Sequence, residues 1–223
     1  MKLGLFGGTF NPIHRCHLTI AGQVRQRMAL DQILFIPANI PPLKSKTDLA
    51  PATDRLEMVR LAVQPLAWAE VSTVEIDRPG PSYSVETVER LRQQRPDDPL
   101  YFVVGTDAFK DIMDWREPER LMRLCELVVI PRVGHPFAAL RTVLDQLAAV
   151  APDRLAALDR GTERCEEVPL AGNGRLWLLA LSPCPISATQ VRAAVNAGEL
   201  LEALLPESVR SYILRRRLYR SSR

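Results

Sequence analysis

The sequence predicts an α/β fold with a doubly wound, mostly parallel sheet. Short apolar runs alternate with amphipathic stretches along the whole chain, and most of the runs are continuously apolar. Continuous runs are typical of strands that are buried on both faces, and their alternation with helices favours a parallel sheet covered on both sides. We therefore expect ligands to bind beyond the carboxyl ends of the strands, at one edge of the sheet.

Six short runs indicate the strands, and the stretches between them indicate helices. Thr53 or Asp54 is expected to cap one helix, and Ser82 or Ser84 to open another. A further helical segment is expected after Gly105. The expected strands are residues 3–6, 33–37, 70–76, 100–104, 126–131 and 175–181, and the clearest helices are residues 14–28, 54–63, 84–94 and 186–195. Residues 138–175 indicate helices and a loop with no assignable chemistry.

The length and charge of the chain limit its class of function. A chain of 223 residues is long enough for one large domain, which we place at 1–223 with a C-terminal helical portion at 182–223. Its net charge is +3, and much of that charge comes from the tail LRRRLYRSSR, which we expect to be a solvated helix end. So small a basic excess suits an anionic small molecule and does not require nucleic acid.

The cysteines and the apolar runs indicate a cytoplasmic protein. The four cysteines form no CxxC pair, and a chain of this size needs no disulfide to be stable, so we expect reduced thiols. The first residues are too glycine-rich for a signal peptide, and no apolar run approaches the ~18 residues of a membrane-spanning helix.

The stretch GGTFNPIHRCH holds two of the three histidines of the chain directly after a predicted strand. Gly7 and Gly8 allow backbone N–H groups to approach a ligand, although a tight turn also explains them. His14 and His17 are three residues apart and share one face of a helix start, where phosphate oxygens are favoured. Structural histidines and a zinc site that includes Cys16 are the alternatives.

Two other polar clusters follow predicted strand ends. Asp107 in GTD is placed to accept hydrogen bonds from ribose hydroxyls, or to cap a helix. In ISATQVR, Ser187 and Thr189 are suited to helix capping, and Arg192 could bind a phosphate with two nitrogens. The predicted fold brings both clusters to the same edge of the sheet as the histidines.

Together these stretches resemble the HxGH superfamily of nucleotidyltransferases. GGTFNPIHRCH is similar to its GGTF(D/N)PxHxGH motif, and ISATQVR is similar to its second signature. Segments between and after them, among them PANIPPLK, RLEMVRLA, SYSVETV, VGTDAF, VVIPR and LPESVRSYILRRRLY, resemble nicotinate mononucleotide adenylyltransferases over nearly the whole length. The resemblance implies a Rossmann-like fold and transfer of the adenylyl group of ATP to nicotinate mononucleotide in NAD biosynthesis.

The resemblance also implies roles for particular residues. The catalytic residues would be His14, His17 and Arg192. The ATP site would include Gly7, Gly8, Thr9, Phe10, Gly105, Asp107, Ser187 and Thr189, and the mononucleotide site would include Asn39, Lys44, Tyr83, Ser84, Trp115, Arg116 and Arg132.

The implied chemistry is positioning and charge stabilisation in an in-line displacement. Mg²⁺ would bind mainly through the ATP phosphates, with no site of its own in the motifs. The partners would be ATP and nicotinate mononucleotide, without nucleic acid or membrane, and a homo-oligomer stays open. The sequence departs from the family at Cys16, where glycine would approach adenine closely, and at Arg116, whose guanidinium could pair with the nicotinate carboxylate.

Two other functions are compatible with the same motifs. A phosphopantetheine adenylyltransferase would share both signatures, but such chains are shorter and lack the segment around Tyr83. A nucleotide-binding sensor without catalysis would be expected to have an incomplete signature, whereas both histidines and Arg192 are present. A dinucleotide-dependent oxidoreductase would need a GxGxxG fingerprint, which is absent.

Overall fold

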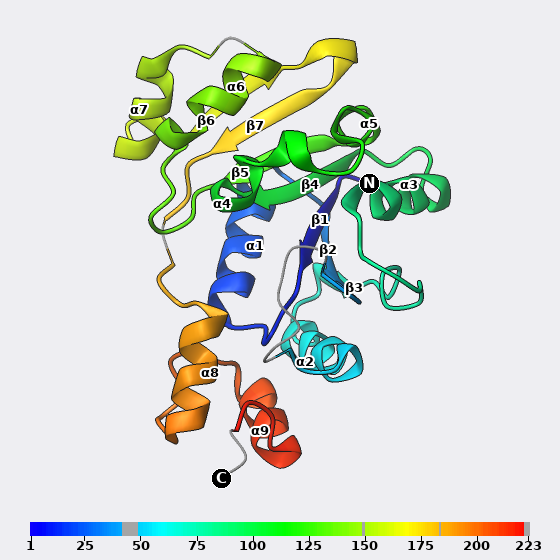
Figure 1. The fold of residues 1–223 in the computed structure, drawn as a ribbon, viewed down its shortest axis with the longest axis vertical. Coiled ribbons are helices and arrows are strands. Elements are labelled where there is room, and N and C mark those ends of the chain that lie inside the picture. Colours follow the sequence, from blue (N-terminus) through cyan, green and yellow to red (C-terminus); the bar gives the residue numbers. More distant parts are fainter. Residues whose placement is uncertain (42–48, 149, 183, 221–223) are drawn as a thin grey trace.

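The computed structural model describes residues 1–41, 49–148, 150–182 and 184–220, and these contain a seven-stranded sheet with helices on both faces (Figure 1). The strand order is β3-β2-β1-β4-β5-β7-β6, and every neighbouring pair is parallel except β6 with β7. The predicted fold class is therefore confirmed. The strands are β1 Leu3–Gly8, β2 Gln32–Pro37, β3 Ala69–Val71, β4 Leu100–Gly105, β5 Glu126–Ile130, β6 Cys165–Pro169 and β7 Arg175–Leu179.

Successive strand residues point to opposite faces and so build two separate hydrophobic cores. Leu5 of β1 belongs to one core and Phe6 to the other, and Val129 and Ile130 of β5 divide in the same way. Helices α3, α5, α6 and α7 pack on the Leu5 face, and α1, α2, α8 and α9 on the Phe6 face. The helices are α1 Arg15–Arg27, α2 Ala52–Val63, α3 Ser84–Gln94, α4 Thr106–Phe109, α5 Pro118–Leu124, α6 Arg141–Leu147, α7 Pro152–Arg160, α8 Ala188–Ala197 and α9 Glu207–Arg216.

Several element boundaries differ from the prediction. The strand expected at 70–76 ends at Val71, because β3 is an edge strand that pairs only with β2 and the chain then turns. Pro51 takes the N-cap position of α2, so neither Thr53 nor Asp54 caps that helix. Helix α3 begins at Ser84, one of the two serines proposed to open it.

The segment 138–175 contains a strand that the sequence did not reveal. Strand β6 pairs with β7 in antiparallel register and forms one edge of the sheet. Its sequence, CEEVP, alternates weakly and carries two glutamates, as suits an edge strand, and so shows no apolar run. The helices expected in this segment are present as α6 and α7.

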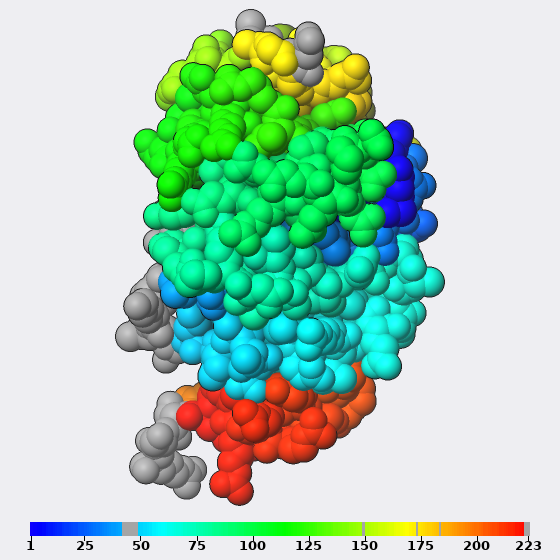
Figure 2. Space-filling model, turned by 90° about the vertical axis from the view of Figure 1, so that its right-hand side faces the viewer, coloured from blue at the N-terminus to red at the C-terminus, as the bar shows by residue number. Residues whose placement is uncertain are grey.

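The C-terminal helices lie at one end of the molecule, and α9 packs beside α2 (Figures 1 and 2). The predicted solvated helix end is confirmed for residues 214–216, which finish α9 and are exposed, but not for Leu218 and Tyr219. Leu218 and Tyr219 are partly buried and pack against the core on the Phe6 face, because two left-handed residues, Arg217 and Tyr219, turn the chain back. Within the described residues, no helix combines the length and apolarity needed to cross a membrane.

Candidate active site

A cavity of about 990 Å³ lies beyond the carboxyl ends of β1, β4, β5 and β7. The strand order reverses here, with β2 on one side of β1 and β4 on the other, and such switch points are where α/β sheets bind ligands. All residues that we predicted for ATP and catalysis line this cavity, as does Arg132: Gly7, Gly8, Thr9, Phe10, His14, His17, Gly105, Asp107, Ser187, Thr189 and Arg192.

The glycine loop follows β1 and leads into α1. A β-carbon at Gly7 would meet only the Phe102 ring, at 4.0 Å, so the described protein atoms leave room for a side chain there. Glycine at this position is therefore not needed for packing, but it allows a ligand to approach the backbone closely. Phe10 has a φ of 47°, a left-handed conformation that costs an L-residue about 1–2 kcal/mol. Its buried ring, 5.2 Å from the ring of His17, offsets that cost.

The two histidines meet at the start of α1. His14 is the N-cap residue rather than part of the first turn, and His17 is the third helical residue. Their ring centroids are 3.7 Å apart. The backbone N–H of His14 donates to Nδ1 of His17 at 3.2 Å, which leaves the proton of a neutral His17 ring on Nε2. The expected free N–H groups are partly used, because that of Arg15 donates to Leu204.

His14 is only 2% exposed. Burial, together with the nearby positive charge of Arg132, lowers the pKa of His14 from 6.5 to about 4. Its side chain faces the backbone N–H of His17 in a capping arrangement, although the geometry at the buried Nδ1 atom falls short of a full hydrogen bond. The imidazole that lines the cavity is therefore buried and neutral at pH 7.

This lowered pKa makes the stability of the ligand-free protein pH-dependent. The unfolded chain takes up a proton at His14 below pH 6.5, whereas the folded chain does so only near pH 4. The contribution of neutral His14 to the free energy of unfolding is complete above pH 6.5. It decreases as the pH falls, by about 2 kcal/mol between pH 7 and pH 5. Urea unfolding at pH 7 and pH 5 should therefore show that the free energy of unfolding falls less for His14→Asn than for the wild type. Equal losses would contradict the burial of a neutral His14.

The end of β4 brings a second polar group into the cavity. Arg132 pairs with Asp107, with 3.6 Å between Nε and Oδ1. A β-carbon at Gly105 would approach both Asp107 and Arg132, the Cγ atom of Arg132 at 2.9 Å. A side chain at Gly105 would therefore force Asp107 and Arg132 to move away from the strand end. Asp107 lies in the short helix α4 and Gly105 takes the N-cap position, so the alternative of an Asp107 cap is excluded.

The second signature opens α8 on the opposite side of the cavity. Ser187 is the N-cap residue, and its hydroxyl accepts a hydrogen bond from the backbone N–H of Gln190 at 3.2 Å. Arg192 donates from one terminal nitrogen to the backbone oxygen of Asn11 at 3.0 Å and from the other to Thr189 at 3.4 Å. The guanidinium is thus fixed against the glycine loop by neutral partners, and its positive charge faces the cavity that it lines.

A disulfide joins the two signatures, contrary to the expected reduced thiols. Cys16 in α1 is bonded to Cys184 in the loop before α8, with 5.6 Å between their Cα atoms. The two cysteines are 168 positions apart in the sequence, which gave no sign of this bond, because only the parallel sheet brings the two segments together. Cys16 is therefore not available to the alternative zinc site. No three potential metal ligands gather anywhere in the part of the chain that the structure describes.

The described residues predicted for the mononucleotide, Arg132 apart, lie around the start of α3, outside this cavity. The backbone N–H of Asn39 donates to the hydroxyl of Ser82 at 3.0 Å. Tyr83 is the N-cap residue of α3 without a side-chain cap, and the guanidinium of Arg116 lies 4.8 Å from its ring centre. Arg116 also pairs with Glu86 at 2.9 Å, so its charge is already partly matched.

Two further predicted residues complete this account. Trp115 packs edge-on against Phe102, with ring centroids 6.3 Å apart. Its buried Nε1 atom has no hydrogen-bond partner in the described part of the chain. Lys44 lies outside the described residues.

Arg55 connects the two sites, and the sequence analysis missed it. This fully buried guanidinium donates to the backbone oxygens of Thr9 at 2.8 Å and Asn39 at 2.8 Å. It also donates to Ala38 and Ala50. The loops after β1 and β2 are thereby held in one arrangement. A signal was present, because Arg55 lies on the same helical stripe as the buried Met58 and Val59.

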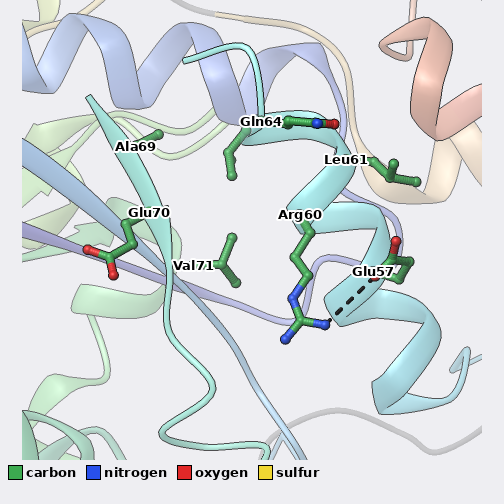
Figure 3. A pocket seen from close by; sticks show the side chains of 8 residues that line it. Glu57, Arg60, Leu61, Gln64, Ala69, Glu70 and Val71 are labelled. Carbon is green, nitrogen blue, oxygen red and sulfur yellow. Dashed lines mark ion pairs between the residues drawn. The ribbon is translucent and has the colours of Figure 1, made fainter. Parts of the chain in front are cut away.

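A second, smaller cavity of about 360 Å³ lies between α2 and β3 (Figure 3). Arg60 and Glu57 lie on its α2 side, 3.8 Å apart, and Glu70 and Val71 come from the edge strand. None of the predicted site residues lines it. We therefore place the candidate active site in the larger cavity.

Comparisons with known proteins show what the whole chain is similar to. Residues 5–194 match the family described as Cytidylyltransferase-like. A protein of Desulfatibacillum aliphaticivorans named "Probable nicotinate-nucleotide adenylyltransferase" is 41% identical and covers 98% of this chain and 100% of its own. A protein of Geobacter metallireducens with the same name is 38% identical, and both chains are covered in full.

Solved structures show the same fold. A nicotinic acid mononucleotide adenylyltransferase of Plasmodium falciparum complexed with NaAD has a TM-score of 0.69 at 16% identity, covering 98% of this chain and 97% of its own. The two named relatives, at 38–41% sequence identity over the whole length, are much more similar to this chain in sequence than the solved structure is. The chain belongs to the nicotinate-nucleotide adenylyltransferase family.

Proposed function

We propose that the chain transfers the adenylyl group of ATP to nicotinate mononucleotide, giving nicotinate adenine dinucleotide and pyrophosphate in NAD biosynthesis. The observation that carries this proposal is the single cavity in which the glycine loop, the paired histidines and Arg192 meet. The names of the full-length relatives support it. One solved structure of the same fold is complexed with NaAD and another with APC.

The ATP phosphates are assigned to the larger cavity. His14 and His17 donate to the α-phosphate and to the departing pyrophosphate, and Arg192 closes over the triphosphate with Ser187 and Thr189. The backbone groups of Gly7, Gly8, Thr9 and Phe10 line the nucleotide, and Gly105 and Asp107 hold the ribose. These donors are fixed before substrate arrives, so they meet the developing charge without reorganisation.

The acceptor is assigned to the start of α3. Its first N–H groups, at Ser84 and the two residues after it, have no side-chain cap and suit the nicotinate carboxylate. Trp115 and Tyr83 offer aromatic faces for the pyridine ring. Asn39 and Lys44 cover the mononucleotide phosphate. Arg132 is assigned a phosphate contact at the boundary of the two sites, beside Asp107.

Mg²⁺ enters this proposal as a companion of ATP. No group of three metal-ligating side chains occurs in the described residues, and we assign the ion to the ATP phosphates. When bound, the ion neutralises part of the triphosphate charge. The protein supplies the positions: the mononucleotide phosphate attacks the α-phosphorus in line while pyrophosphate leaves.

The wider organisation is part of the same proposal. Residues 1–223 form one nucleotidyltransferase domain in which 182–223 completes the ATP site, as the contact of Arg192 with Asn11 supports. The partners are the two small-molecule substrates, and the location is the cytoplasm. The Cys16–Cys184 bond speaks against the reduced state assumed for that location and makes redox conditions a variable of every assay.

An assay of pyrophosphate release tests the proposed function. Release should require ATP and nicotinate mononucleotide together, stop with excess EDTA and return when Mg²⁺ is added. ATP without an acceptor is the control for simple hydrolysis. Release that ignores the mononucleotide, or that survives EDTA, would contradict the proposed reaction.

A further inference from the structure

The C-terminal tail reaches the glycine loop through one residue. The hydroxyl of Tyr219 donates to Oδ1 of Asn11 at 2.9 Å. The same oxygen accepts the backbone N–H of Ala50 at 3.0 Å. The backbone oxygen of Asn11 accepts from Arg192. Asn11 therefore joins the tail, the segment before α2 and the second signature at the wall of the ATP cavity.

Both segments that meet in this contact contain a left-handed residue, and such a conformation needs support. Phe10, directly before Asn11, is left-handed with a φ of 47°, and Tyr219 is left-handed with a φ of 62°. Conformations of this kind persist only where surrounding contacts hold them, and they gather at functional sites. The contact between Tyr219 and Asn11 is one such restraint, and it ties the last described turn of the chain to the first loop.

The hydroxyl of Tyr219 is suited to be a permanent donor. Burial raises the pKa of this phenol, although Arg55 and Arg192 act in the opposite direction. The phenol therefore stays protonated at any pH at which the enzyme is assayed. The same two arginines contact the glycine loop, at Thr9 and at Asn11.

We propose that Tyr219 is a positioning residue for ATP, which acts through Asn11 to hold the glycine loop and Arg192 in the arrangement that receives the triphosphate. This role rests on the proposed function. Tyr219 does not line the cavity, so it contacts no substrate itself. Without its hydroxyl, the loop would have to be ordered when ATP binds, at the expense of affinity.

Tyr219→Phe tests this role, with Tyr212→Phe as the matched control. Tyr212 lies in α9, and its hydroxyl donates to Asp54 at 2.7 Å, away from the glycine loop. Each variant loses one hydroxyl from the C-terminal region. We expect Tyr219→Phe to raise KM for ATP about 5- to 10-fold, the range of one hydrogen bond, with KM for the mononucleotide and kcat changed less than twofold. Tyr212→Phe should leave KM for ATP unchanged.

A double-substitution cycle tests the route through Asn11. In an Asn11→Ala background, Tyr219→Phe should cause no further rise in KM for ATP, because the shared contact is already lost. Additive effects would overturn this route. A wild-type KM for ATP in Tyr219→Phe, or an equal rise in Tyr212→Phe, would overturn the role itself.

Equilibrium binding of MgATP keeps the two proposals separate. Calorimetric titration of the wild type and of both tyrosine variants needs no acceptor and no turnover. A dissociation constant for MgATP that is 5- to 10-fold larger in Tyr219→Phe alone supports the positioning role, even if transfer to nicotinate mononucleotide is not observed. Equal constants for all three proteins would overturn it even if transfer is normal.

Discussion

His17→Ala is expected to lower kcat at saturating ATP and nicotinate mononucleotide by at least about 100-fold, the scale of losing one preorganised oxyanion donor. The backbone N–H of His14 donates to Nδ1 of His17, so a neutral ring presents its Nε2 proton to the cavity. Alanine removes that donor where negative charge grows on the leaving pyrophosphate. Steady-state kinetics on the purified variant measure the loss.

The third histidine offers a matched control. His135 lines the same cavity, and its hydrogen bonds with Thr106 and Arg132 use its backbone atoms, which His135→Ala retains. We expect a much smaller loss of kcat in that variant. Urea unfolding of both variants shows whether the fold is kept. A folded His17→Ala enzyme with near-normal turnover would contradict the assignment of His17.

The acceptor site is expected to favour nicotinate over nicotinamide mononucleotide by about two to four powers of ten in kcat/KM. The uncapped N–H groups at the start of α3 are donors, which a carboxylate satisfies with both oxygens. The amide of nicotinamide would turn its own NH₂ group toward some of them, and each unpaired buried group costs about 1–3 kcal/mol. Measuring kcat/KM for both mononucleotides gives the ratio.

Arg116 contributes a smaller share of this selectivity. Its side chain is 52% exposed and is paired with Glu86, so solvent and a competing carboxylate reduce its effect on the ligand. Arg116→Ala should therefore lower the ratio in part, with most of the preference kept by the backbone donors. Equal efficiency on the two mononucleotides in the wild type would contradict this account of the pocket. A ratio unchanged in Arg116→Ala would leave the backbone donors as its only source.

The sequence could predict the sheet, and that the polar stretches meet at one edge of it, because both depend on local patterns. Continuous apolar runs identify buried strands, and polar stretches at their ends must meet at one sheet edge once the strands are parallel. His14, Asp107 and Arg192 lie far apart in the chain and yet line one cavity. Their roles in catalysis stay predictions that the kinetic tests address.

Other features depended on contacts that no local pattern reveals. The pair Cys16–Cys184 and the contact of Tyr219 with Asn11 join segments more than 160 residues apart. The tail was predicted only in part, because its arginines indicate an exposed helix end but do not reveal that Leu218 and Tyr219 pack against the core. Arg55 was overlooked although it interrupts the apolar stripe of α2, where an arginine is buried only if backbone oxygens or carboxylates surround it.

The most direct test of the central claim follows the oxygen atoms of the acceptor. Nicotinate mononucleotide with ¹⁸O in its phosphate group is incubated with MgATP and the enzyme, and both products are analysed by mass spectrometry. Attack of that phosphate on the α-phosphorus predicts that all of the label appears in nicotinate adenine dinucleotide and that the pyrophosphate is unlabelled. Label in the pyrophosphate, or no dinucleotide, would contradict adenylyl transfer in this cavity.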